Sequence, residues 1–252
     1  MDFEIKIKEK FYINKHDKKK ITALKNINIK INSNEFICIV GPSGCGKTTL
    51  MNMIGGLISS NDQIIFANKN NKKHKNKDFG YVFQSSRLLP WLTIKENIEL
   101  VTEESFDDYA KIENLLSNFG LKDFANYYPK SISGGMRRKV SLARALVNEP
   151  KVLLMDEPFI SLDQPTSRNL YNVLLEYWHK NPITIIFITH NLKEAILLGE
   201  RIVFFSKRPG TVVFDYKIKS RTAHKFNIDN QEVDNEYSKL IKKYPKLLDG
   251  VL

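Results

Sequence analysis

The fold of this chain is decided by one stretch, Gly41-Pro42-Ser43-Gly44-Cys45-Gly46-Lys47-Thr48, which Thr49 follows directly. It fits the spacing G-x-x-x-x-G-K-[ST], comes after the apolar run Phe36–Val40 and opens a helical pattern that reaches about Leu57. Glycines let backbone N–H groups curl around phosphate oxygens, and the N-terminus of the helix adds a positive potential. In such a loop Lys47 reaches the terminal phosphates and the Thr48 hydroxyl ligates Mg²⁺. The stretch therefore predicts a buried strand, a phosphate-binding loop and a helix.

A second apolar run, Val152–Met155, ends in two carboxylates, Asp156 and Glu157. If this strand lies beside the strand Phe36–Val40, Asp156 comes to the Mg²⁺ shell. Glu157 then lies where a general base polarises the attacking water. We therefore predict Asp156 as a metal ligand and Glu157 as the catalytic base.

Strand-like and helical segments alternate along the chain, which predicts an α/β architecture with a largely parallel core sheet. Alternation of apolar and polar residues in Phe3–Lys8 and Ile27–Ile31 predicts antiparallel strands with one face in water. Local signals predict the remaining elements. These are helices from Thr93 (with Glu96) to Val101, Phe106–Phe119 before Gly120, Gly135–Val147, and others opening at Pro165 and at Asn191 (with Glu194), and strands Gly80–Phe83, Ile183–Thr189, Arg201–Ser206 and Thr211–Asp215.

Composition narrows the class of protein. A chain of 252 residues with 42% hydrophobic residues can bury a core, so global disorder is excluded. No run approaches the ~18–20 apolar residues that cross a bilayer, and the N-terminus resembles no signal peptide, which predicts a cytoplasmic protein. Two cysteines, Cys38 and Cys45, are too few for a disulfide framework, and they are either a redox pair or ordinary small residues.

Charge leaves more than one partner open. The formal net charge of +11 suits nucleic acid, an anionic membrane surface or nucleotide phosphate. The Asn/Lys-rich stretch 68–77 could touch phosphate or lipid headgroups, or form a solvated hairpin loop. We assign it no chemistry.

A third motif reads Ile132-Ser133-Gly134-Gly135-Met136. With the two segments above it resembles the nucleotide-binding subunit of ATP-binding-cassette (ABC) transporters, whose signature is Leu-Ser-Gly-Gly-Gln. The sequence departs from it at Ile132 and Met136. It keeps Ser133, Gly134 and Gly135, whose hydroxyl and N–H groups contact the γ-phosphate in that family. Without the family, Ser-Gly-Gly opening a helix predicts a second anion-binding end.

The resemblance implies further site residues, in the family's order along the chain. Gln84 matches the Q-loop glutamine that senses Mg²⁺ and water, and Asp163 ends a D-loop that reads Ser-Leu-Asp. His190 matches the switch histidine that hydrogen-bonds the γ-phosphate. An N-terminal aromatic that stacks on adenine is also implied, for which Phe11 aligns best and Tyr12 is the alternative.

The same resemblance implies a P-loop NTPase (RecA-like) core with an antiparallel β-subdomain and an inserted helical subdomain. The cassette would span 1–220, with the helical part at about 86–148, and 221–252 would be a short helical tail. ATP and Mg²⁺ are the implied cofactors. The implied partners are a second copy of the chain, transmembrane permease subunits and, indirectly, a solute-binding protein, all without nucleic acid. Two cassettes would bind head to tail, at the cytoplasmic face of the inner membrane.

Three shorter segments resemble importers of the nitrate, sulfonate and taurine group. They are Leu88-Leu89-Pro90-Trp91, Asp156-Glu157-Pro158-Phe159 and Ser206-Lys207-Arg208-Pro209-Gly210. In these importers the first segment lies at a groove that receives a helix of the permease, although core packing of the helical subdomain would also explain it. The alternatives at this level are a cassette for lipid traffic or export, an ATPase associated with nucleic acid, and a nucleotide-gated interaction module.

Overall fold

The structure is a computed structural model. It describes residues 2–14, 17–59, 64–65, 78–103, 106–218 and 231–251. They belong to two units, the first formed by 1–76 and 184–252 and the second by 77–183. The Asn/Lys-rich stretch 68–77 lies outside the described residues.

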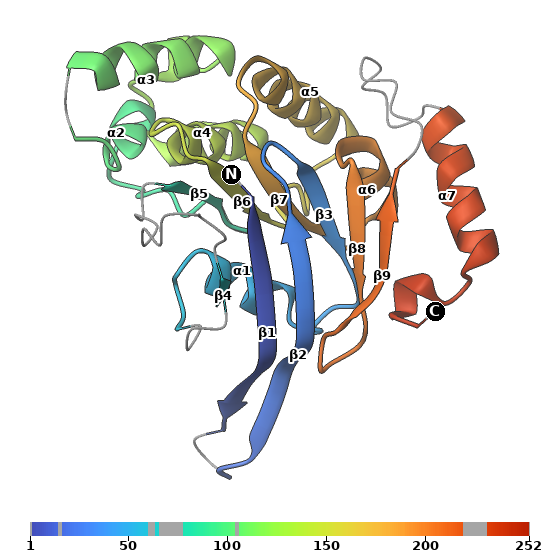
Figure 1. Cartoon of the computed structure of the whole chain (residues 1–252). Coiled ribbons are helices and arrows are strands. Elements are labelled where there is room, and N and C mark those ends of the chain that lie inside the picture. Colours follow the sequence, from blue (N-terminus) through green and yellow to red (C-terminus); the bar gives the residue numbers. More distant parts are fainter. Residues whose placement is uncertain are drawn as a thin grey trace. The chain divides into compact units, whose positions relative to one another are not determined.

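Parallel strands around the phosphate-loop motif form the core of the first unit (Figure 1). Strand β3 (Phe36–Val40) pairs in parallel with β7 (Thr184–Thr189) and with β8 (Arg201–Phe205), and β9 (Val212–Lys217) pairs antiparallel with β8. Every residue of β3 and β7 is buried, as expected for strands that are covered on both faces. The predicted parallel sheet is therefore confirmed. The expected position of Val152–Met155 directly beside Phe36–Val40 is wrong, because β7 and β8 pair with β3 on its two sides. The last strand runs two residues beyond its predicted end.

An antiparallel sheet forms the other part of this unit. Strand β1 (Phe3–Ile13) pairs with β2 (Lys20–Ile31) and with the short β4 (Ile64–Ile65). The predicted antiparallel pair is confirmed, but both strands are longer than predicted, because cross-strand contacts such as the 2.8 Å ion pair between Lys20 and Glu9 extend the hairpin.

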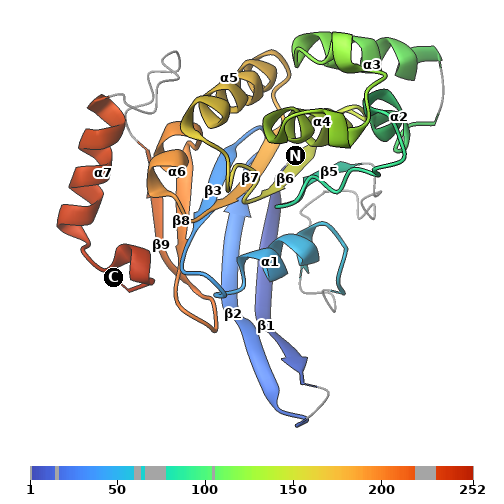
Figure 2. The ribbon, with the colours of Figure 1, turned by 180° about the vertical axis from the view of Figure 1, so that it is seen from behind.

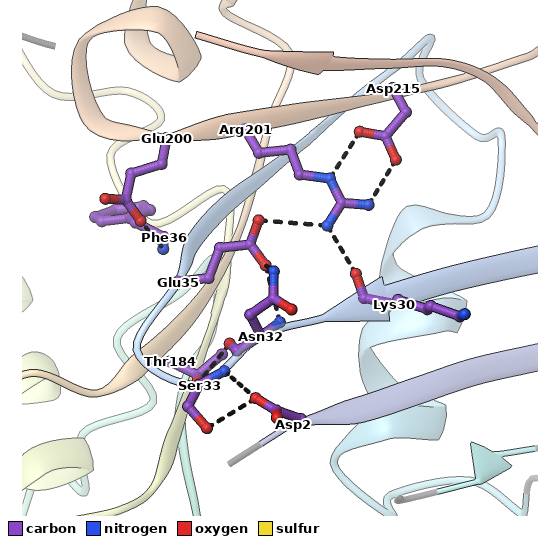
Figure 3. A network of polar contacts seen from close by, with 10 residues as sticks. All are labelled: Asp2, Lys30, Asn32, Ser33, Glu35, Phe36, Thr184, Glu200, Arg201 and Asp215. Atoms are coloured by element: carbon purple, nitrogen blue, oxygen red, sulfur yellow. Dashed lines mark hydrogen bonds and ion pairs between the residues drawn. The ribbon is translucent and has the colours of Figure 1, made fainter. Parts of the chain in front are cut away.

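A polar network fixes the start of β3, at the end opposite the phosphate loop (Figure 3). The Arg201 guanidinium donates to both carboxylate oxygens of Asp215, at 2.7 and 2.5 Å, and to the Lys30 carbonyl at 2.7 Å. Its ion pair with Glu35 measures 3.3 Å. Charge-assisted bonds of this kind have defined geometry, so β3 enters the sheet from an anchored turn.

The helices of the first unit begin where local signals predict. Helix α1 (Lys47–Ile54) follows the phosphate loop, and α6 (Leu192–Leu198) begins at the cap residue Asn191. The tail holds α7 (Gln231–Lys243) and a 3-10 turn, η4 (Leu247–Asp249). Figures 1 and 2 show α7 beside α6 from two sides, and an ion pair of 2.6 Å joins Lys193 of α6 to Asp234 of α7.

The second unit contains strands β5 (Phe79–Val82) and β6 (Val152–Asp156), which pair in parallel. Its helices are α2 (Ile94–Glu99), α3 (Phe106–Asn118), α4 (Gly134–Leu146) and α5 (Gln164–Lys180), with 3-10 turns η2 (Lys122–Phe124) and η3 (Pro129–Ser131). The predicted capping box of Thr93 and Glu96 is present. Gly120 adopts φ 63° just after α3, which is the conformation of a helix C-terminus.

Two expectations from composition can be compared with the described residues. Cys38 and Cys45 are both buried and form no disulfide with each other. Within the described ranges, no helix combines the length and apolar character that a bilayer crossing requires. The boundaries of the cassette and of its helical subdomain stay predictions.

Candidate nucleotide-binding site

The phosphate loop occupies the turn between β3 and α1. Gly44 and Gly46 have φ of 74° and 111°, which side chains rarely adopt. A Cβ at Gly46 would lie 2.7 Å from the Ala23 carbonyl oxygen, so no larger residue fits there without a shift. Successive N–H groups in such a turn form a concave site for an anion. The predicted loop therefore has the backbone that phosphate binding requires.

Lys47 supplies the cation of this loop. Its side chain is only 5% exposed, and Nζ donates to the carbonyl oxygens of Gly41 at 2.8 Å and Pro42 at 3.0 Å. These bonds hold the ammonium group against the loop rather than in solvent. Thr48, the next residue, is exposed in the first turn of α1, so its hydroxyl is accessible to a ligand.

Phe11 and Tyr12 are adjacent aromatic residues of β1, and their side chains have different neighbours. The Tyr12 hydroxyl donates to the Thr49 hydroxyl at 3.3 Å. The Phe11 ring instead carries the Lys20 ammonium 4.3 Å from its centroid. Consecutive residues of a strand point to opposite faces, so Tyr12 contacts the residue that follows the phosphate loop and Phe11 pairs with a lysine.

His190 directly follows β7, at the same edge of the sheet where the phosphate loop follows β3. Val40 pairs in register with Thr189, so Gly41 and His190 both follow directly after neighbouring parallel strands, which lie about 4.8 Å apart. The imidazole is exposed. The first unit thus brings together the phosphate loop, Tyr12 and His190.

The turn that carries His190 is held by residues whose role the sequence did not indicate. The buried Thr189 hydroxyl donates to the Glu194 carboxylate and accepts from the Asn191 N–H at 3.0 Å. The Asn191 side chain in turn accepts from the N–H groups of Lys193 and Glu194. Glu194 was identified only as the residue three positions after a helix cap, because nothing local indicates that its carboxylate turns back to β7.

The two predicted carboxylates lie at the carboxyl end of β6. Asp156 is buried, and its charge adds to burial in raising the pKa of Tyr81 on the neighbouring strand β5. Glu157 has φ 44°, and Ser161 in the same turn has φ 65°. Left-handed backbone at a non-glycine residue costs roughly 1–2 kcal/mol, and such strain concentrates at functional sites. The strained turn therefore supports a functional role for Glu157.

Gln84 follows β5 at the edge of the sheet where the two carboxylates lie at the end of the neighbouring strand β6. Val82, the last residue of β5, pairs with Met155. Gln84 therefore lies two residues after this pair on one strand, and Asp156, the last residue of β6, lies one residue after it on the other. The Gln84 side chain is exposed. The second unit thus brings Gln84, Asp156 and Glu157 to one edge.

The signature residues open α4, as predicted. Ser133 is its N-cap, and its Oγ accepts from the Met136 N–H at 3.2 Å. Gly135 is required by packing, because a Cβ there would lie 2.4 Å from Thr166 Cγ2 of α5. Ser133 and Gly134 are exposed, and a helix N-terminus attracts anions. Asp163 directly precedes α5 and is exposed too.

Known proteins with similar sequences are nucleotide-binding subunits of transporters, in agreement with the phosphate loop found here. A family model described as ABC transporter matches residues 24–160. The chain is 37% identical over 247 residues to the aliphatic sulfonates import ATP-binding protein SsuB of Bacillus subtilis (strain 168), covering 95% of each chain. It is 38% identical over 202 residues to the taurine import ATP-binding protein TauB of Jannaschia sp. (strain CCS1), covering 79% of this chain and 75% of the other.

Solved structures give the same answer. The dimeric post-hydrolysis state of the ATP-binding cassette MJ0796, bound to ADP and Pi, aligns with a TM-score of 0.72 and 32% identity over 88% of this chain and 100% of the other. The structure of cbiO1 from Clostridium perfringens, part of the transporter complex cbiONQ, aligns with a TM-score of 0.74, and at 24% identity it supports the fold alone. With its phosphate loop, strand-end carboxylates and signature turn, the chain belongs to the ABC transporter family as an ATP-binding and ATP-hydrolysing subunit with the P-loop NTPase fold.

Proposed function

We propose that this chain is the ATPase of an importer for small anionic or polar solutes such as nitrate, sulfonates or taurine. It would drive transmembrane permease subunits from the cytoplasmic face of the membrane, and a solute-binding protein would act through those subunits. The preformed phosphate loop, with left-handed glycines and a buried Lys47, is the observation that carries the proposal. The names of SsuB and TauB support the class of solute.

The residues of the site fit a nucleotide with Mg²⁺. Backbone N–H groups of the loop and Lys47 suit the phosphates, because they offer only donors and positive charge. Thr48 offers a hydroxyl, Asp156 a carboxylate and Gln84 an amide oxygen, and Mg²⁺ takes oxygen ligands. When bound, the ion neutralises charge on the phosphate oxygens.

In the proposed hydrolysis, Glu157, His190 and Asp163 each have a separate role. Glu157 would accept the proton of the attacking water as general base. His190 would donate a hydrogen bond to an oxygen of the γ-phosphate, and the turn built by Thr189 and Glu194 would fix its position. Asp163 would lie at the partner cassette.

We further propose that two copies of the chain bind ATP head to tail. The reason is that this chain offers two anion-binding helix ends, the phosphate loop before α1 and Ser133–Gly135 before α4. In a head-to-tail pair both ends reach one triphosphate, one from each copy. Binding of ATP would then close the dimer, and hydrolysis would reopen it.

Concentration dependence tests this shared site. We expect the ATPase activity per subunit to rise with protein concentration at low concentration and then to level off, because dimerisation precedes turnover. Steady-state hydrolysis should be measured from nanomolar to micromolar protein together with the sedimentation of the same samples. A specific activity that stays constant down to nanomolar protein would contradict the shared site while leaving ATP hydrolysis itself intact.

Either Phe11 or Tyr12 would be the aromatic residue that stacks on adenine, and mutagenesis can distinguish the two. The sequence favours Phe11, whereas the bond between Tyr12 and Thr49 supports Tyr12. Stacking of a base on an aromatic ring contributes ≈ 1–3 kcal/mol, so Tyr12→Ala is expected to weaken ATP binding by at least about 5-fold. Tyr12→Phe keeps the ring and should bind nearly as the parent does. Equilibrium titration with a fluorescent ATP analogue measures both, and a larger loss in Phe11→Ala would return the role to Phe11.

The permease contact is proposed at the segment before α2. Trp91 is 69% exposed, which is unusual for so large an apolar side chain. Leu88 and Leu89 beside it are half-buried. An exposed tryptophan next to leucines is typical of an anchor in a protein interface, which supports this segment as the place where the permease binds.

A further inference from the structure

The segment between β5 and α2 is irregular, and side chains hold its backbone in place. Arg138 of α4 donates from Nη1 to the Phe83 carbonyl at 2.8 Å and from Nη2 to the Gln84 carbonyl at 2.6 Å. A second arginine of the same helix, Arg144, donates to the carbonyls of Arg87 at 2.9 Å and Ser86 at 2.9 Å. Two guanidinium groups of one helix thus bind four backbone carbonyls in and around Gln84.

These contacts are specific to arginine. A guanidinium presents its donors in a planar fork, so that Nη1 and Nη2 of one arginine can each bind a different carbonyl in a fixed direction, whereas all donors of an ammonium group lie on one atom. Arg138 is buried and Arg144 half-buried. Burial lowers the pKa of both groups, a sign that they have lost water. A buried donor that loses its acceptor costs more than an exposed one, so this arrangement resists change.

The rest of the segment is also held. The Arg87 guanidinium lies 3.7 Å from the centroid of the Phe83 ring, so a residue before Gln84 contacts one three positions after it. Asn97 of α2 accepts from the Leu89 N–H at 2.8 Å and donates to the Leu89 carbonyl at 3.1 Å. The backbone around Gln84 is thus bound to side chains of both α4 and α2.

Helix α4 therefore has a contact at each of two proposed sites. Its first residues are the Ser133–Gly135 turn, which the proposed function places at the nucleotide of the partner copy. Arg138 and Arg144 lie five and eleven residues after Ser133, about 8 and 16 Å along a rigid helix. Gln84, which they hold, belongs to the nucleotide of its own copy.

We propose that Arg138 and Arg144 are positioning residues that tie Gln84 to α4, and so link the two nucleotide sites of the dimer. This inference rests on the proposed function. When the turn Ser133–Gly135 closes on one nucleotide, α4 carries the arginines and draws the Gln84 backbone to its place at the other. Neither arginine touches the nucleotide itself.

A double-mutant cycle tests whether Arg138 acts through Gln84. We expect Arg138→Met to lower kcat about 10-fold with KM for ATP changed less than 2-fold, since only the position of Gln84 is lost. In the background Gln84→Ala, the same change should cost less than 2-fold. Cooperativity of hydrolysis with respect to ATP should also fall toward a Hill coefficient of 1 in Arg138→Met and Arg144→Met.

Arg137 provides a matched control on the same helix. It also donates to two carbonyls, those of Pro129 at 3.2 Å and Ile132 at 2.6 Å, but neither belongs to the Gln84 segment. The effect of Arg137→Met should be the same with and without Gln84. If Arg138→Met does not fold, Arg138→Gln keeps part of the hydrogen bonding, and Arg144→Lys keeps the charge without the fork.

The outcomes separate the two levels of the proposal. Equal losses from Arg138→Met in both backgrounds, with cooperativity retained, would overturn the link and leave the ATPase assignment untouched. Wild-type kcat in Gln84→Ala alone would overturn the role of Gln84 and this inference with it. A loss in Arg138→Met that disappears in Gln84→Ala supports the link, and melting temperatures of all variants show that folding is not the cause.

Discussion

Replacement of Glu157 by glutamine is expected to lower the rate of ATP hydrolysis by about 100- to 10,000-fold, the range that a positioned general base contributes. Glutamine keeps the size of the side chain and its hydrogen-bonding atoms, but it cannot accept the proton of the attacking water. Binding of ATP should persist, because the change leaves the phosphate loop and the contacts of Lys47 as they are. The variant should therefore accumulate an ATP-bound dimer, which size-exclusion chromatography with and without MgATP detects.

The control for this change is Glu176→Gln. Glu176 is exposed on α5, so the same loss of one negative charge occurs away from the strand end. Its hydrolysis rate should equal that of the parent. If Glu157→Gln hydrolysed ATP near the parent rate, another group would have to be the base, and the strained turn at Glu157 would need a different explanation.

The second large effect is expected for Lys47→Met, which should weaken MgATP binding by about 10- to 100-fold and abolish measurable turnover. A hydrogen bond to a charged group contributes ≈ 1.5–3 kcal/mol, and each 1.4 kcal/mol is tenfold in affinity. The bonds from Lys47 to Gly41 and Pro42 show that the ammonium already lies at the loop, so little ordering is needed when phosphate binds. Isothermal titration calorimetry measures the change in affinity.

Lys25→Met is the matched control for charge. Lys25 is exposed on β2, and its loss lowers the net charge by the same amount. If both variants lost the same affinity, the effect would come from the overall positive charge rather than from a placed cation. Unchanged affinity in Lys47→Met would remove the phosphate loop from nucleotide binding altogether.

The part of the fold that follows local rules could be predicted from the sequence. Glycine spacing determined the phosphate loop, and cap residues determined where α2 and α6 begin, because a few neighbouring residues decide these features. Apolar runs and the residues that end them also predicted the carboxylates at a strand end and a largely parallel sheet. The sequence did not determine which strands are neighbours: the expected place of Val152–Met155 beside Phe36–Val40 is wrong, because β7 and β8 pair with β3 on its two sides.

Other features depended on contacts between residues far apart in sequence. Lysine-rich ends of β1 and β2 carry weak strand signals, and pairing across the hairpin makes them strands. The pairing of β1 with β2 shifts register between Lys10 and Phe11. Because such a shift changes which face of the sheet a side chain occupies, it bears on the directions of Phe11 and Tyr12. No local pattern in the sequence indicated the shift.

By itself, then, the sequence determined which groups this protein carries: a phosphate loop, a pair of carboxylates at a strand end and a Ser-Gly-Gly turn that opens a helix. Only the tertiary structure decided how those groups are held, as in the bond from Thr189 to Glu194 and the arginines of α4 on the Gln84 segment. The physical reason is the distance in sequence over which each kind of interaction acts. Backbone conformation is set by adjacent residues, whereas the partner of a buried polar side chain is chosen among groups that only folding brings together.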